Sequence, residues 1–161
     1  MESSAEERLS FISVPALVTS VLLSTVLFAG SLWVWYLLGP SVHAQVTVFQ
    51  VGTLLFIVLL LLGVMLSLGY SHLWAVGDEV VIRNGLFVRR YRVEQIAGVR
   101  LRKGDPWAYL LVKDPDAEAG YVRKAALAIQ SVEGEQASRK VRQLRRWLKA
   151  NGATGVERDI T

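Results

Sequence analysis

The chain has 161 residues, a formal net charge of +4 and no cysteine, and 52% of its residues are hydrophobic. Without cysteine it cannot form disulfides, thiolate metal sites or a cysteine nucleophile. From Leu9 to Gly77 the sequence contains 69 consecutive residues without Asp, Glu, Lys or Arg. A soluble domain carries charged residues on its exposed faces, whereas an ionised side chain at a bilayer centre costs about 2.5–3.5 kcal/mol. The uncharged stretch therefore excludes an ordinary soluble domain and indicates a membrane segment.

The uncharged stretch contains two apolar runs, residues 15–38 and 46–68, joined by a short connection at residues 39–45. A helix rises about 1.5 Å per residue, so about 20 residues cross the roughly 30 Å hydrocarbon core. Both runs are long enough, and we expect residues 11–70 to form a two-helix transmembrane hairpin. The segment before the first run is acidic and a second run follows, which disfavours a cleaved signal peptide.

The distribution of basic residues predicts how the hairpin is oriented. The connection at residues 39–45 has no Lys or Arg, whereas residues 78–161 carry 17 Lys and Arg against 11 Asp and Glu. Basic residues remain on the cytoplasmic side of a membrane. We therefore expect a multi-pass protein of the cell (inner) membrane with both termini cytoplasmic, including a short N-terminal segment at residues 1–10.

The sequence after Ser71 changes to the alternating pattern of β-strands. Asn84-Gly85 lies between two alternating segments and predicts a hairpin with a type I′ turn. About six strands are expected, in an antiparallel meander. They are residues 71–76, 79–83, 86–92, 97–103, 107–113 and 121–130.

One amphipathic helix is expected at residues 134–150, ending at Asn151-Gly152. A curved meander of this size leaves one end open, and this helix is expected to cover it. Residues 153–161 have no periodicity and are expected to form a flexible tail. The apolar stripe of the helix consists of Ala137, Val141, Leu144 and Leu148.

The run VVIRNGLFVRRYRVEQIAGVR, residues 80–100, resembles bacterial pleckstrin-homology-like (PH-like) domains, in which a hairpin precedes a polar turn and I-x-G-V. GDPWAYL at 104–110, LAIQ at 127–130 and the start of the final helix resemble one actinobacterial group. This is the low-molecular-weight protein antigen six PH domain group, whose members often carry two transmembrane helices before the domain. The resemblance implies an α+β fold with a PH-like domain at residues 71–152. That domain would be a small antiparallel β-barrel or meander capped by one C-terminal amphipathic helix. The resemblance implies no activity.

The residues needed for catalysis are not assembled in this sequence. The two histidines, His43 and His72, are expected at opposite faces of the membrane, so they cannot share a metal ion. There is no phosphate-binding glycine loop, and the acidic residues lie in turns or at the start of the helix. We therefore expect no enzyme, no metal and no cofactor.

Basic side chains are the feature of the sequence that points to a candidate binding surface. Arg90 and Arg92 share one strand face, with Tyr91 facing the core, and the next strand repeats this arrangement with Leu101 facing the core. If these strands pair, four guanidinium groups cluster. The helix adds a second basic stripe. The basic candidates for contact with anionic lipid or a partner are Arg90, Arg92, Arg100, Arg102, Arg139, Arg142 and Arg146.

Two functions remain open for this protein, and a basic surface that is simply solvated is the alternative to one that contacts a ligand. We expect a membrane-anchored, non-enzymatic adaptor or accessory protein that presents its domain at the cytoplasmic leaflet to a protein partner or a second copy. The alternative is a module that senses anionic lipid headgroups through its basic face. The loop at residues 76–79, taken as the first strand loop, is acidic and departs from lipid-binding PH domains. Nucleic acid is not expected, because aromatic residues are not interleaved with the basic ones.

Overall fold

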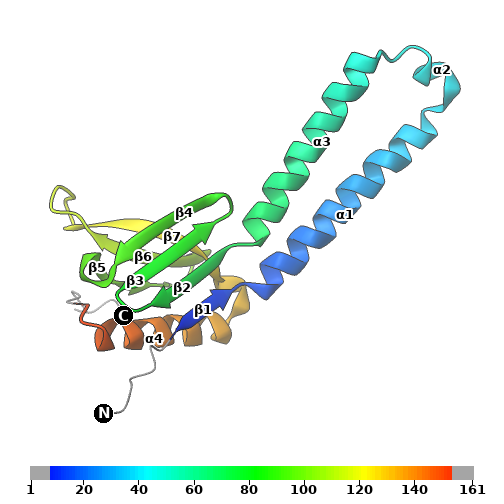
Figure 1. The fold of residues 1–161 in the computed structure, drawn as a ribbon. Helices are drawn as coiled ribbons and strands as arrows, with labels where there is room; N and C mark the ends of the chain where they lie inside the picture. The colour runs from blue at the N-terminus through cyan, green and yellow to red at the C-terminus, as the bar shows by residue number, and fades with distance from the viewer. Residues whose placement is uncertain (1–7, 154–161) are drawn as a thin grey trace.

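The computed structural model of the chain describes residues 8–153. Two long helices, α1 (Val14–Leu37) and α3 (Val48–Gly69), leave one corner of a domain made of two sheets and one helix (Figure 1). A short helix, α2 (Gly39–His43), joins their far ends. The expectations for residues 1–7 and for most of the tail lie outside the described residues.

The caps of the two long helices explain where they begin. Ser13 caps α1 by accepting the Ala16 backbone N–H at 3.4 Å, and Thr47 forms a capping box with Gln50 at the start of α3. Both helices are long and apolar enough to cross a membrane, and only 11% and 6% of their most apolar segments is buried. They approach closely at one place, where a Cβ on Gly69 would overlap Ser20.

Seven strands in the described residues form two antiparallel sheets. The first sheet has the order β1 (Leu9–Ile12), β2 (His72–Val76), β3 (Glu79–Asn84) and β4 (Phe87–Arg92). The second has the order β5 (Ile96–Arg100), β6 (Trp107–Lys113) and β7 (Tyr121–Gln130). Short 3₁₀ turns, η1 (Val93–Gln95) and η2 (Ser131–Glu133), follow β4 and β7. The α+β class is confirmed, but these strands do not close into a barrel.

Strand β1 was not expected from the sequence. It pairs antiparallel with β2, with Leu9 opposite Ala75 and Ile12 opposite His72. Leu9 and Phe11 are buried in the core beneath the sheets. The helical hairpin is therefore the connection between two paired strands, and the loop at residues 76–79 is the second strand loop rather than the first.

The β3–β4 turn lies one residue later than expected. Asn84 pairs with Phe87, so the turn residues are Gly85 and Leu86, with Gly85 at a φ of 64°. Asn84 stays in the strand because its side chain bridges the two sheets. Its Nδ2 donates to the Ala125 carbonyl at 2.6 Å, and its Oδ1 accepts the Leu127 N–H at 3.1 Å.

Helix α4 (Glu135–Ala150) covers the core as its stripe predicts. The predicted stripe residues are all buried, and Trp147 is buried beside them. Arg145 fixes the helix to the second sheet by donating from Nε to the Val99 carbonyl at 3.0 Å. Figure 1 shows α4 along the bottom of the domain, while α1 and α3 leave from its upper right corner.

Candidate functional site

The junction between the helical hairpin and the domain contains almost no linker. Only Ser13 separates β1 from α1, and only Tyr70 and Ser71 separate α3 from β2. Both serines are buried, and the Ser71 hydroxyl donates to the Leu68 carbonyl at 2.7 Å. The domain is therefore joined directly to both helices, with at most two residues between a helix and a strand.

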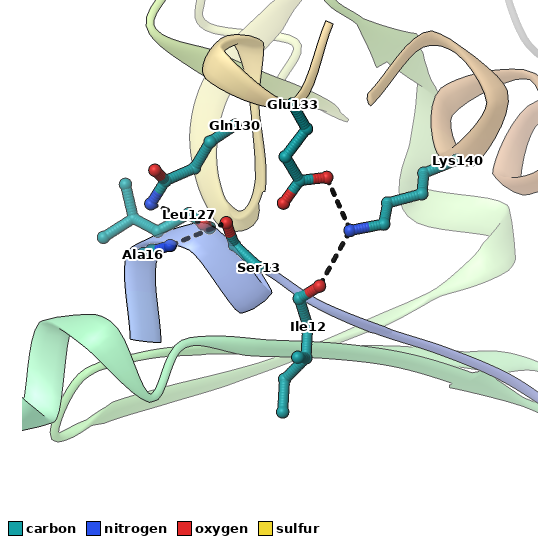
Figure 2. Close-up of polar contacts among 7 residues, drawn as sticks. All are labelled: Ile12, Ser13, Ala16, Leu127, Gln130, Glu133 and Lys140. Atoms are coloured by element: carbon teal, nitrogen blue, oxygen red, sulfur yellow. Dashed lines mark hydrogen bonds and ion pairs between the residues drawn. The ribbon is translucent and has the colours of Figure 1, made fainter. Parts of the chain in front are cut away.

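A buried ion pair ties the last helix to this junction (Figure 2). Lys140 Nζ donates to the Ile12 carbonyl at 2.7 Å and to Glu133 Oε2 at 2.6 Å. The Glu133 side chain is 1% exposed, and its other oxygen has no hydrogen-bond partner among the described residues. Removing one partner of a buried pair leaves an uncompensated charge, so this contact resists separation. It holds α4 and η2 against the residue that precedes Ser13.

The β3–β4 turn lies directly beside the domain end of α3. A Cβ placed on Gly85 would lie 3.0 Å from Ser67 Oγ, so no side chain separates the turn from the helix. Arg83 Nε donates to the Gly85 carbonyl at 3.2 Å, and its guanidinium lies 5.2 Å from the centre of the Tyr70 ring. The turn is thereby fixed at the level where α3 enters the domain.

The expected cluster of four arginines does not form. Arg90 and Arg92 lie on β4 of the first sheet, whereas Arg100 lies on β5 of the second sheet, and these strands do not pair. The chain changes sheets at η1, where Val93 is buried in the core. Arg102 is exposed in the turn after β5, where its N–H donates to Asp105 Oδ2 at 2.9 Å.

Arg100 is buried rather than exposed, at 4% of its full accessibility, and its Nε has no hydrogen-bond partner among residues 8–153. It was expected on a solvent face because the sequence alternates apolar and basic residues. In β5, however, both faces are covered, since neighbouring residues on either face are also buried. Tyr91 and Leu101 pack against the core as expected.

The arginines of α4 form a separate surface. Arg139, Arg142 and Arg146 are exposed. They border a hollow of about 610 Å³, whose floor includes Trp147. Figure 1 shows α4 along the bottom of the domain, while the hairpin leaves from its upper right corner. The structure therefore does not combine it with the arginines of β4.

Two basic residues near the hairpin were missed by the sequence analysis. Arg83 lies at the end of β3, and Arg89 is exposed on β4 opposite Ile82. Both lie toward the β3–β4 turn, whereas Arg90 is opposite Val81 and Arg92 is opposite Glu79, nearer the other end of the strand. The doublet Arg89-Arg90 was visible in the sequence, but only alternate positions were considered.

Acidic side chains gather at the opposite end of the first sheet. Asp78 and Glu79 lie at the β2–β3 turn, and Glu94 lies in η1, which is tied to that turn by the Val93 N–H and the Asp78 carbonyl at 2.7 Å. The end of the first sheet far from α3 thus carries these acidic residues together with Arg92, whereas the end beside α3 carries Arg83 and Arg89.

Each of the two histidines forms a hydrogen bond within its own part of the structure. His43 bonds the Trp35 carbonyl at 2.9 Å, and His72 Nε2 bonds Ser10 Oγ at 2.6 Å. Desolvation, with smaller contributions from Arg8 and Arg83, lowers the pKa of His72 below its usual 6.5. No group of three His, Cys, Asp or Glu side chains in the described part of the chain could hold a metal ion.

The comparison with known families agrees with this architecture. Residues 71–147 match the family model described as Bacterial PH domain. Comparisons with curated proteins and with solved structures found no match. The matched region begins just before β2, so β1 and both apolar helices precede it. Residues 71–147 are thus similar to bacterial PH domains, and in this chain two apolar helices connect the first two strands of the first sheet.

Proposed function

We propose that this protein is a membrane-anchored, non-enzymatic module that holds its PH-like domain in a fixed orientation at the cytoplasmic leaflet, as an adaptor or accessory protein. The observation that carries the proposal is the replacement of the β1–β2 turn by the apolar hairpin. The layout also supports the resemblance to the actinobacterial group described above.

The exposure and position of the two helices favour membrane spans over the alternatives. A core helix of a soluble protein is mostly buried, whereas both of these helices are mostly exposed. Cleavage after α1, as in a secretory signal, would remove β1 and with it Leu9 and Phe11 from the core. A hairpin that remains attached at both ends fits the contacts better.

The surface of α4 is the best candidate for partner contact. Its exposed arginines border a hollow on a helix that lies along the bottom of the domain, away from the corner where α1 and α3 leave it. Guanidinium groups beside an aromatic floor suit an acidic protein surface. Anchoring confines the domain to the membrane surface, which raises its effective concentration toward partners at that surface.

Cysteine labelling tests the anchoring, because the chain contains no cysteine. In intact cells, a membrane-impermeant thiol reagent should label Ser41→Cys in α2 but not Ser131→Cys in η2. Alkaline extraction should leave the full chain in the membrane fraction. Labelling of Ser131→Cys alone would reverse the orientation, and release at alkaline pH would refute the anchor.

Crosslinking tests the adaptor role. A photoreactive residue at Gln143, in the hollow of α4, should give defined adducts in native membranes, and Arg142→Glu should abolish them. The same residue at Asp116, in the exposed β6–β7 connection, is the control. Equal adducts at both positions would argue against α4 as the contact surface.

Contact with anionic lipid is the second candidate, favoured by the basic residues of β3 and β4. Each basic residue near an anionic leaflet contributes about 1 kcal/mol, so Arg83, Arg89 and Arg90 together give roughly 3 kcal/mol, on the order of millimolar affinity. The full chain should then draw phosphatidylglycerol around itself in mixed vesicles, and salt should weaken this enrichment. Arg89→Gln with Arg90→Gln should reduce it, whereas Arg142→Gln should not.

A further inference from the structure

The β3–β4 turn exposes three consecutive apolar side chains. Leu86, Phe87 and Val88 are 78%, 74% and 51% exposed. Two-residue hairpin turns normally carry Gly, Asn or Asp, and soluble proteins rarely expose contiguous large apolar residues. A Leu-Phe-Val sequence at this position therefore needs an apolar environment that covers it.

The position of the turn identifies that environment. Gly85 contacts Ser67, which is two residues before the end of α3 at Gly69. A helix of 22 residues is about 33 Å long, close to the roughly 30 Å hydrocarbon core, so Ser67 lies within about one helical turn of the boundary. Leu86 and Phe87 follow Gly85 directly and lie within about 8 Å of it along the chain.

The turn is also held rigidly in this place. The Asn84 side chain bonds two backbone groups of β7, and Arg83 bonds the Gly85 carbonyl. Figure 1 shows the turn between β3 and β4 close to the lower end of α3. The exposed side chains therefore cannot withdraw into the domain without breaking these contacts.

The charged residues around the turn match the chemistry of a lipid interface. Arg89 and Arg90 are two and three residues beyond Phe87, about 7 and 10 Å along the strand. Guanidinium groups at this spacing reach the headgroup layer when the apolar tip lies at the edge of the hydrocarbon. The acidic Asp78 and Glu79 are at the far end of the same sheet.

We propose that the β3–β4 tip, defined by Leu86, Phe87 and Val88, inserts into the lipid interface beside α3 as a third membrane contact of this chain. The proposal rests on the membrane anchoring proposed above. Lipid acyl chains cover the exposed side chains of the tip. Three contacts, α1, α3 and the tip, define a plane and would fix the tilt of the domain as well as its height.

Fluorescence quenching tests insertion in the full chain. Single cysteines at Leu86 and at Phe87 would carry an environment-sensitive fluorophore, in vesicles of phosphatidylglycerol and phosphatidylcholine. Nitroxide-labelled lipids, with the nitroxide near the headgroup or near the bilayer centre, act as quenchers. Leu60→Cys in the middle of α3 controls for the span, and Glu118→Cys in the exposed β6–β7 connection controls for solvent.

Both tip positions should show blue-shifted emission and strong loss of intensity with the shallow nitroxide, while Glu118→Cys shows neither. Leu60→Cys should be quenched by the deep nitroxide. Tip labels that remain unquenched while Leu60→Cys is quenched would overturn insertion and leave the anchor intact. A tip label that is blue-shifted only at high protein-to-lipid ratio, without quenching, would overturn it in favour of a second copy. An unquenched Leu60→Cys would refute the anchoring itself.

Discussion

Removing strand β1 should destabilise the domain severely, although the matched PH region begins after it. The experiment compares two proteins that lack the apolar hairpin. In the first, residues 8–12 are joined to 72–153 by an Asn-Gly turn that replaces the hairpin. Ile12 and His72 are direct partners, so a two-residue turn can connect them. The second protein is residues 72–153 alone.

The expected difference follows from two core side chains. Leu9 and Phe11 are 5% and 6% exposed, and burying a large apolar side chain contributes about 1.5–3 kcal/mol. Their loss removes roughly 3–6 kcal/mol. A small domain has a total unfolding free energy of about 5–15 kcal/mol, so the fragment without β1 should be marginal or unfolded.

Urea unfolding followed by tryptophan fluorescence measures the difference. In the joined protein, Phe11→Ala should lower the unfolding free energy by about 3–5 kcal/mol. Ser10→Ala, on the exposed face of the same strand, should lower it by less than about 1 kcal/mol. If the fragment 72–153 unfolds at the same urea concentration as the joined protein, the assignment of β1 to the core is wrong.

Four further substitutions examine the packing and the pH dependence of the domain, each in the joined protein. Leu144→Ala should destabilise it by about 2–5 kcal/mol and Arg142→Ala by less than about 0.5 kcal/mol in thermal melts, and equal effects would contradict the packing of α4. Asn84→Ala should cost about 1–3 kcal/mol in urea unfolding, because it leaves backbone groups of β7 without partners; no loss would mean that Asn84 does not bridge the sheets. Because the pKa of His72 is lowered in the folded state, the unfolded chain binds more protons just below about pH 6.5. The free energy of unfolding should therefore rise with pH up to that value, and His72→Gln should flatten this rise. An unchanged slope in the variant would contradict the lowered pKa.

The second half of the chain was the more predictable part. Strands β6 and β7 have the expected bounds because their alternation is uninterrupted and Gly, Asp and Pro mark their ends. The stripe of α4 was correct because a period of 3.6 residues leaves one choice of buried face. Alternation, turn residues and helical periodicity are local patterns, so they can be identified from the sequence without knowing the tertiary contacts.

Strand β1 was missed, and Arg100 was wrongly expected on a solvent face, for a common reason: tertiary contacts decide both. The four residues of β1 merge with the apolar run that follows, and their partner strand lies beyond the whole hairpin. Arg100 alternates with apolar residues, yet its strand is covered on both faces. The exposed β3–β4 turn was not recognised as a site for the same reason. Its place at the base of α3 depends on the tertiary contact between Gly85 and Ser67.

In the anchoring proposed above, the position of the hairpin would couple folding of the domain to insertion of both helices. The chain makes β1 first, then α1 and α3, and only afterwards the strand with which β1 pairs. In a membrane-spanning hairpin, β1 and β2 meet only if α3 returns the chain to the side on which it began. A chain with one inserted span would separate Leu9 and Phe11 from the core and lose the roughly 3–6 kcal/mol that their burial contributes. Under the proposed anchoring, folding of the domain would thus stabilise the expected topology, in addition to the basic residues that favour the cytoplasmic side.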